Sequence, residues 1–189
     1  MNSQTKVESK AISSQANAIL NGEEGEQKQT FVVLGVLLEF LASPEQVDGE
    51  IGLIRGTLPP QTVVPLHSHS DPEVFYVLEG QLEVYEATGW RAAEAGGTVA
   101  IPGNVRHALR NASSQPATTL TVTKAELYRF FRELARRLDP AQPFAPLTPE
   151  EMQRVFHAAA KHHYWIASPA ENAAIGLFLG PLAVGPIQF

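Results

Sequence analysis

The stretch His67-Ser68-His69-Ser70-Asp71-Pro72-Glu73 places three residues of metal-binding types within seven positions. Alternate side chains of a β-strand project from one face, so we expect His67 and His69 to point the same way, with α-carbons about 6.6 Å apart. Asp71-Pro72 is a turn signal, after which Glu73 can begin a second strand and bring its carboxylate beside the two imidazoles. The stretch therefore indicates a site at which side chains share one metal ion.

A second spaced string, Gly96-x5-Pro102-x4-His107-x3-Asn111, follows later in the chain. His107 opens another β-like run and can supply a fourth ligand. Both strings resemble the two sequence motifs of the cupin superfamily, with Gly80 at the turn that follows the first. The resemblance is to small, single-domain, quercetin-dioxygenase-like bacterial cupins and covers Phe31 to Thr123.

This resemblance implies a double-stranded β-helix, a jelly-roll-like barrel with the metal inside. It implies these metal ligands: His67, His69, Glu73 and His107. The sequence departs from the family pattern at two places, because Gln61 replaces a usual glycine and Pro102-Gly103-Asn104 has its glycine one position early. Asn tolerates the left-handed backbone conformation better than most residues, so we expect Asn104 to form the turn before His107.

The residue pattern independently predicts an all-β core. From Thr30 to about Val122, short β-branched and aromatic runs alternate with Gly, Pro and Asn, which is typical of a barrel or sandwich. The predicted strands are Phe31 to Phe40, Gly49 to Leu58, Val63 to His69, Glu73 to Leu78, Gln81 to Ala87, Gly97 to Ile101, His107 to Asn111 and Thr118 to Thr123.

The sequence predicts three regions: an arm before this β-rich pattern, the pattern itself and an extension after it. Residues 1–29 are polar and predict a flexible N-terminal arm, residues 30–123 form the cupin barrel, and residues 124–189 form a helical extension with an apolar tail. Apolar residues recur at helical spacing from Lys124 to Leu138. A second helix is expected to begin at the N-cap Thr148 and to reach about His163.

Composition excludes several classes of function. The chain has no cysteine, so disulfides, cysteine-ligated zinc, iron–sulfur clusters and thiol nucleophiles are excluded. The net charge of −6 offers no basic field for nucleic acid or anionic lipid. Two apolar stretches, 31–42 and 173–187, are shorter than the roughly 20 residues of a membrane helix, and no signal peptide is evident. We therefore expect a cytoplasmic protein without nucleic-acid or membrane partners.

Three imidazoles and one carboxylate suit one divalent transition metal per chain: iron, manganese, nickel, cobalt, copper or zinc. Strand alternation places Phe75 and Val77 on the face of Glu73, and Leu109 and Asn111 on the face of His107. We predict that these four residues line a largely apolar substrate pocket. Such a pocket favours an uncharged or aromatic compound over a sugar phosphate.

The leading functional hypothesis is a metal-dependent dioxygenase that acts on a small enol, phenol or flavonol-like compound. Glu73 would serve as a ligand that can also move a proton. The alternatives are a non-catalytic small-molecule-binding or sensor cupin, and a metal-assisted isomerase or decarboxylase. The apolar segments Phe31 to Phe40 and Ile175 to Ile187 exceed what one small barrel readily buries, so a homodimer is also expected.

Overall fold

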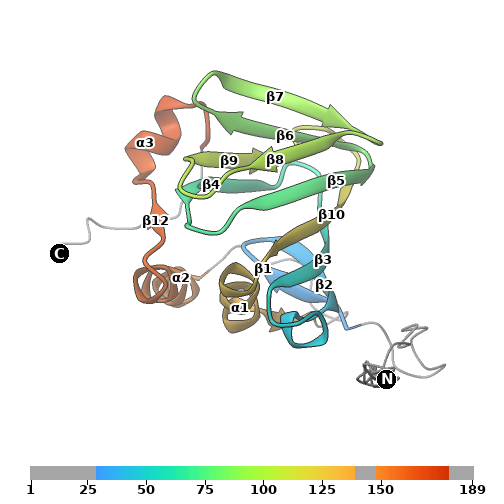
Figure 1. The fold of residues 1–189 in the computed structure, drawn as a ribbon. Coiled ribbons are helices and arrows are strands. Elements are labelled where there is room, and N and C mark those ends of the chain that lie inside the picture. The colour runs from blue at the N-terminus through green and yellow to red at the C-terminus, as the bar shows by residue number, and fades with distance from the viewer. Residues whose placement is uncertain (1–28, 139–147, 179–189) are drawn as a thin grey trace, which may run out of the picture.

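The computed structural model describes residues 29–138 and 148–178. All of the predicted N-terminal arm except its last residue, and the end of the apolar tail, lie outside the described residues. Two antiparallel sheets stack face to face in a jelly roll, which confirms the predicted fold class (Figure 1). Among the described residues the strands form two separate hydrogen-bonded sheets and do not close into one continuous barrel.

In the described part of the chain, seven strands form the larger sheet. In spatial order they are β11 (Arg136–Arg137), β1 (Phe31–Val33), β2 (Val36–Ala42), β3 (Ile51–Leu58), β10 (Ala117–Lys124), β5 (Glu73–Glu79) and β8 (Thr98–Ile101). The smaller sheet has the order β12 (Trp165–Ile166), β4 (Val63–Ser68), β9 (His107–Arg110), β6 (Gln81–Glu86) and β7 (Gly89–Glu94). A short 3₁₀ helix, η1 (Pro44–Gln46), precedes β3.

Alternation along the strands defines the interior. On β5, Phe75 and Val77 are buried, whereas Val74 and Tyr76 are 38% and 45% exposed. The period of two therefore directs Glu73 into the space between the sheets together with Phe75 and Val77. Apolar side chains from both sheets fill the rest of this core, including Leu58, Leu82, Val84, Ile101 and Leu109.

Helices α1 (Ala125–Leu134) and α2 (Pro149–Lys161) lie side by side at the lower left in the view of Figure 1. Leu127 and Phe130 of α1 and Val155 of α2 join one buried cluster with Ile54 of β3. The predicted N-cap is confirmed, since Glu151 N–H donates to Thr148 Oγ1 over 3.2 Å. None of the described helices is long and apolar enough to cross a membrane.

The structure corrects several predicted elements. The single strand from Phe31 to Phe40 is a hairpin of β1 and β2, because Leu34 and Gly35 adopt left-handed conformations with φ of 50° and 80°. The first helix stops at Leu134 instead of Leu138, and β11 follows it. Strand β7 was not predicted.

Within its described residues, 124–138 and 148–178, the extension holds three helices instead of two. The third, α3 (Pro169–Ala174), follows β12 in a segment whose structure the sequence left unassigned. Figure 1 shows α3 beside the smaller sheet. Leu177 packs there with Leu66 and Ala108, which project from the side of β4 and β9 opposite the core.

Candidate metal centre

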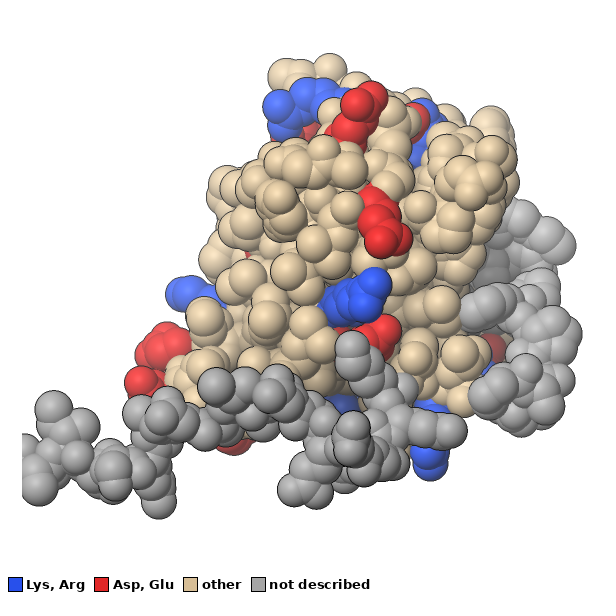
Figure 2. Space-filling view, turned by 90° about the vertical axis from the view of Figure 1, so that its right-hand side faces the viewer, with Lys and Arg blue, Asp and Glu red and all other residues tan. Residues whose placement is uncertain are grey.

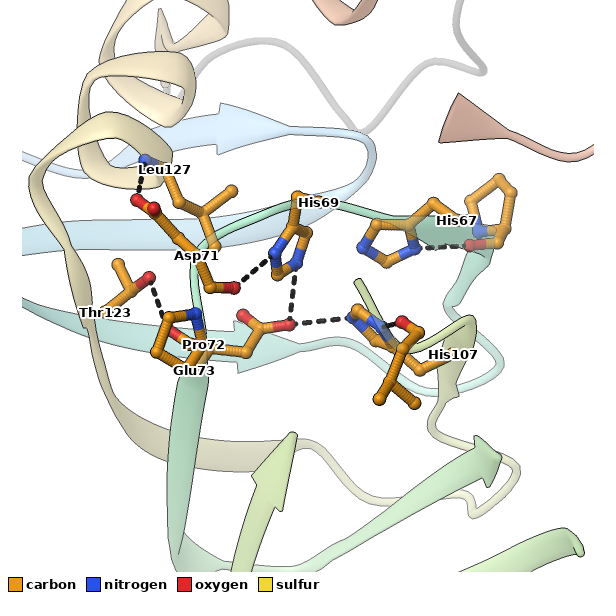
Figure 3. A network of polar contacts seen from close by, with 10 residues as sticks. His67, His69, Asp71, Pro72, Glu73, His107, Thr123 and Leu127 are labelled. Atoms are coloured by element: carbon orange, nitrogen blue, oxygen red, sulfur yellow. Dashed lines mark hydrogen bonds and ion pairs between the residues drawn. The ribbon is translucent and has the colours of Figure 1, made fainter. Parts of the chain in front are cut away.

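The four predicted ligands lie together in the structure. Their potential ligand atoms all lie within 4.8 Å of one another. His67 belongs to β4, His69 follows that strand, Glu73 begins β5 and His107 begins β9 (Figure 3). His69, Glu73 and His107 are almost fully buried, with exposures of 3%, 3% and 1%. Both sheets therefore contribute ligands to one interior site.

Strand pairing and two tight turns create this proximity. In the ladder between β4 and β9, His67 lies directly opposite His107. Asn104 has a φ of 64°, which confirms its predicted left-handed conformation, and its N–H donates to the His69 carbonyl over 2.6 Å. Gln61, at the other departure from the family pattern, is also left-handed, with a φ of 61°. Each of the two residues thus adopts a glycine-like conformation without a glycine.

Each histidine ring is oriented by its Nδ1 atom. A carbonyl oxygen can only accept, so each Nδ1 carries the proton and each Nε2 faces the site. The three contacts are His67 Nδ1 to Pro65 O at 2.8 Å, His69 Nδ1 to Asp71 O at 2.7 Å and His107 Nδ1 to Val105 O at 2.9 Å. Once Nε2 carries no proton, this arrangement leaves its lone pair free for a metal ion.

Glu73 connects two of these rings. Its Oε1 lies 2.8 Å from His107 Nε2 and 3.2 Å from His69 Nε2. Burial opposes ionisation of Glu73, but its hydrogen bonds to His107 and His69 outweigh burial and lower the pKa of the carboxyl below its ordinary value. The site therefore holds a buried carboxylate against imidazole nitrogens.

The two histidines of the first string differ in their electrostatics. Burial, together with His107 and His69, lowers the pKa of His67 to about 3, so this ring is neutral near pH 7. Burial also disfavours charge on His69, but the hydrogen bond and the charge of Glu73 prevail and raise its pKa. Glu73 therefore favours positive charge at the position that a cation would take.

These residues fit a divalent transition metal. Three imidazole nitrogens with fixed tautomers and one ionised carboxylate form a donor set suited to first-row metals, and no thiolate is needed. Nδ1 hydrogen bonds to backbone carbonyls are the outer-shell partners that metal-ligating histidines usually have. His67, His69, Glu73 and His107 would hold such an ion.

A buried carboxylate anchors the loop between His69 and Glu73. Asp71 Oδ2 accepts a hydrogen bond of 2.8 Å from the N–H of Leu127 in the first turn of α1. Thr123 Oγ1 donates to the Pro72 carbonyl over 3.0 Å (Figure 3). The sequence indicated only a turn at Asp71-Pro72, because Leu127 is 56 residues away and no local signal connects the two.

A cavity of about 70 Å³ adjoins two of the four residues. His67 and Glu73 lie at its wall, together with Phe75, Leu109 and Thr121. Its other lining residues are Val33, Leu34, Val36, Leu38, Ile54, Gly56, Leu58, Val64, Thr119 and Phe131. Within the part of the chain that the structure describes, no lysine or arginine lines this cavity.

The predicted pocket residues divide into two pairs. Phe75 and Leu109 line the cavity, whereas Val77 is fully buried in the core beyond it. The amide of Asn111 donates to the carbonyls of Leu58 at 2.9 Å and Gln115 at 2.7 Å, so it holds loops together. A role of any of these residues toward a substrate stays a prediction.

Comparison with known proteins agrees with this description. Residues 54–123 match the family model described as a cupin domain. That segment contains all four metal-ligand candidates and runs from β3 to β10. The similarity to the cupin family model is confined to this segment of the chain. No curated protein is significantly similar to the chain in sequence.

Several solved structures are similar to this chain. A sugar phosphate isomerase of the cupin superfamily from Silicibacter pomeroyi shares 25% identity at a TM-score of 0.42, over 48% of this chain and 59% of that one, which is less than two thirds of its length. A predicted oxalate decarboxylase from Thermotoga maritima shares 21% identity at a TM-score of 0.48. The match covers 52% of this chain and 93% of that protein. A polyketide cyclase from Streptomyces resistomycificus shares 16% identity at a TM-score of 0.45. The match covers 65% of this chain and 82% of the cyclase.

Proposed function

We propose that this chain is a metal-dependent dioxygenase that acts on a small, uncharged enol, phenol or flavonol-like compound. The observation that carries the proposal is the position of His67 and Glu73, which form the polar wall of an otherwise largely apolar cavity between the two sheets. A compound in this cavity would lie directly beside the metal ligands.

The residues of the chain have distinct tasks in this proposal. The bound metal supplies Lewis acidity and, when it is a redox-active ion such as iron or manganese, reactivity toward dioxygen. The three imidazoles bind it as neutral donors because their Nδ1 protons are held by carbonyls. Glu73 binds as a carboxylate, the form that its contacts with two Nε2 atoms favour, and in this proposal it also moves a proton.

The cavity walls favour a particular substrate class. Phe75, Leu109 and Phe131 supply apolar surface that excludes water from the reacting atoms. The side chains of Thr119 and Thr121 are buried and add neutral hydrogen-bonding groups. These groups suit the hydroxyl or carbonyl oxygen of an uncharged compound and provide no counter-charge for a phosphate.

Oxygen consumption tests this proposal. The metal-free chain would be loaded separately with Fe²⁺, Mn²⁺, Ni²⁺, Co²⁺, Cu²⁺ or Zn²⁺ and assayed for oxygen uptake with panels of phenols, diketones and flavonols. We expect uptake with at least one redox-active metal and none with Zn²⁺. Conversion without oxygen uptake would favour an isomerase or decarboxylase, and a compound recovered unchanged after tight binding would favour a binding cupin.

The homodimer is a further proposal. Val74, Tyr76 and Val122 lie on neighbouring strands of the larger sheet, face away from the core and are 37–45% exposed. Figure 2, which views the side at the right of Figure 1, shows mostly uncharged atoms with scattered charged side chains. Apolar side chains on one sheet face support self-association. A sedimentation mass of one chain at micromolar concentration would contradict it.

A further inference from the structure

The segment from Tyr164 to Leu177, here called the α3 segment, lies against the strand that carries His67. In the ladder between β12 and β4, Ile166 is opposite His67 and Trp165 is opposite Ser68. Without β12, β4 would be the edge strand of the smaller sheet. The α3 segment therefore covers the backbone edge of a strand that presents a metal ligand at its inner side.

Asn172 makes the most specific contact of this segment. Its side chain has no solvent exposure, and its Oδ1 accepts a hydrogen bond of 2.8 Å from the N–H of Leu66. Its Nδ2 donates to the carbonyls of Ala167 at 3.2 Å and Ser168 at 3.0 Å. The N–H of Ala167 in turn donates to the Leu66 carbonyl over 2.8 Å. Both backbone polar groups of Leu66 are thus bonded to the α3 segment.

Leu66 lies between Pro65, whose carbonyl orients the His67 ring, and His67 itself. The Pro65 carbonyl oxygen lies 2.8 Å from His67 Nδ1. A displacement of the Leu66 peptide would move the carbonyl and the ligand together. Loss of the Asn172 contact would also leave a buried N–H without a partner, which is costly.

Two further contacts fasten the α3 segment to the loop before β9 and to β7. Arg106, which precedes the ligand His107, places its guanidinium carbon 4.0 Å from the ring centre of Trp165. Trp90 Nε1 donates to the Ile175 carbonyl over 2.8 Å. At the inner end of the segment, the ring of Tyr164 lies 5.6 Å from that of the ligand His69.

We infer that Asn172 is a positioning residue of the metal centre, and that docking of the α3 segment and metal binding stabilise each other. This inference rests on the proposed metal binding. If Asn172 holds the Leu66 peptide in the position that metal binding needs, metal affinity falls when the contact is lost. Because coupling between two binding events is reciprocal, metal must then also stabilise the docked segment.

Titration of the full chain with Co²⁺ tests whether Asn172 positions the metal centre. Visible absorption is the readout of coordination. We expect Asn172→Ala to weaken Co²⁺ binding by about 10- to 100-fold, as outer-shell changes typically do, and to alter the Co²⁺ bands. Glu171→Ala is the matched control, because its carboxylate caps α3 at the exposed Ser168 and does not contact Leu66. This control should bind Co²⁺ as the unaltered chain does.

Hydrogen exchange on the unaltered chain tests, without any variant, whether metal binding stabilises the docked α3 segment. Co²⁺ should slow exchange of the Leu66 and Ala167 amide protons. Unchanged exchange at saturating Co²⁺, or unaltered affinity and bands in Asn172→Ala, would overturn the inference while leaving metal binding intact. Absence of Co²⁺ binding by the unaltered chain would instead overturn the metal site itself, and the inference with it.

Discussion

Glu73 and His107 meet across the two sheets, with 2.8 Å between Glu73 Oε1 and His107 Nε2 although 34 residues separate them in the chain. Glu73 begins β5 in the larger sheet, and His107 begins β9 in the smaller one. Their contact is buried, so the carboxylate is held by imidazole nitrogens instead of water. The metal site is therefore also a polar connection between the two sheets.

Replacement of Glu73 by Gln should sharply reduce metal affinity. Gln keeps the size of the side chain but removes the negative charge that favours a cation in a buried site. We expect a loss greater than the roughly 10- to 100-fold typical of outer-shell partners, measured by calorimetric titration. Glu83→Gln is the control, since Glu83 pairs with Arg110 away from the site. Equal affinities of the two variants would contradict the assignment of Glu73.

Metal affinity should fall as the pH is lowered. The pKa of His69 is raised by Glu73, so below this pKa a metal ion must displace a proton from the ring. His67, with a pKa of about 3, remains neutral and adds no dependence near neutrality. We expect about a tenfold loss of affinity per pH unit below the pKa of His69, one proton being displaced. Titrations between about pH 8 and pH 5.5 that give one constant affinity would refute this expectation.

Narrowing the cavity should impair turnover but not metal binding. Gly56 lines the cavity, and a Cβ there would lie 3.3 Å from Thr119 Oγ1. We expect Gly56→Val to lower kcat/KM for the substrate found in the oxygen-uptake panel by about 10- to 200-fold, as steric exclusion of small apolar groups does. Thr57→Val, on the opposite face of the same strand, is the control. Unchanged kcat/KM in Gly56→Val would place the substrate elsewhere.

Substitution of Gly103 should destabilise the fold near the metal loop. A Cβ at Gly103 would lie 2.0 Å from the Ser70 carbonyl oxygen, which is an impossible contact. We expect Gly103→Ala to lower the free energy of unfolding by about 1–3 kcal/mol, because backbone must shift to make room. Chemical denaturation measures this loss. Asn104→Gly keeps the left-handed turn and should lower the free energy of unfolding less than Gly103→Ala does. A larger loss of stability in Asn104→Gly would contradict this prediction.

Parts of the structure that depend on local spacing could be predicted from the sequence. The two-residue spacing of His67 and His69, and the turn before Glu73, correctly indicated that these side chains lie together. The left-handed conformation of Asn104 follows from the tolerance of Asn for positive φ. By contrast, Leu34 gives no such signal, and Gly35 is the one local sign of the turn between β1 and β2 within this apolar run.

Contacts between distant residues could not be predicted in this way. Asp71 bonds to Leu127 across 56 residues, and Asn172 bonds to Leu66 across 106 residues. In each case a side chain satisfies a backbone N–H that belongs to a different element, and neither sequence neighbourhood contains the partner. The position of the α3 segment could not be predicted either, because it depends on the edge of β4 that the segment covers.

Metal analysis of the purified protein shows whether the four residues of the candidate centre bind an ion. The chain would be purified without chelators or a metal-binding tag and analysed beside His69→Ala, before and after anaerobic loading with each divalent metal. We expect about one equivalent of a transition metal per chain in the unaltered protein and its loss in the variant. Absence of metal from both proteins after loading, or equal metal content in the two, would contradict it.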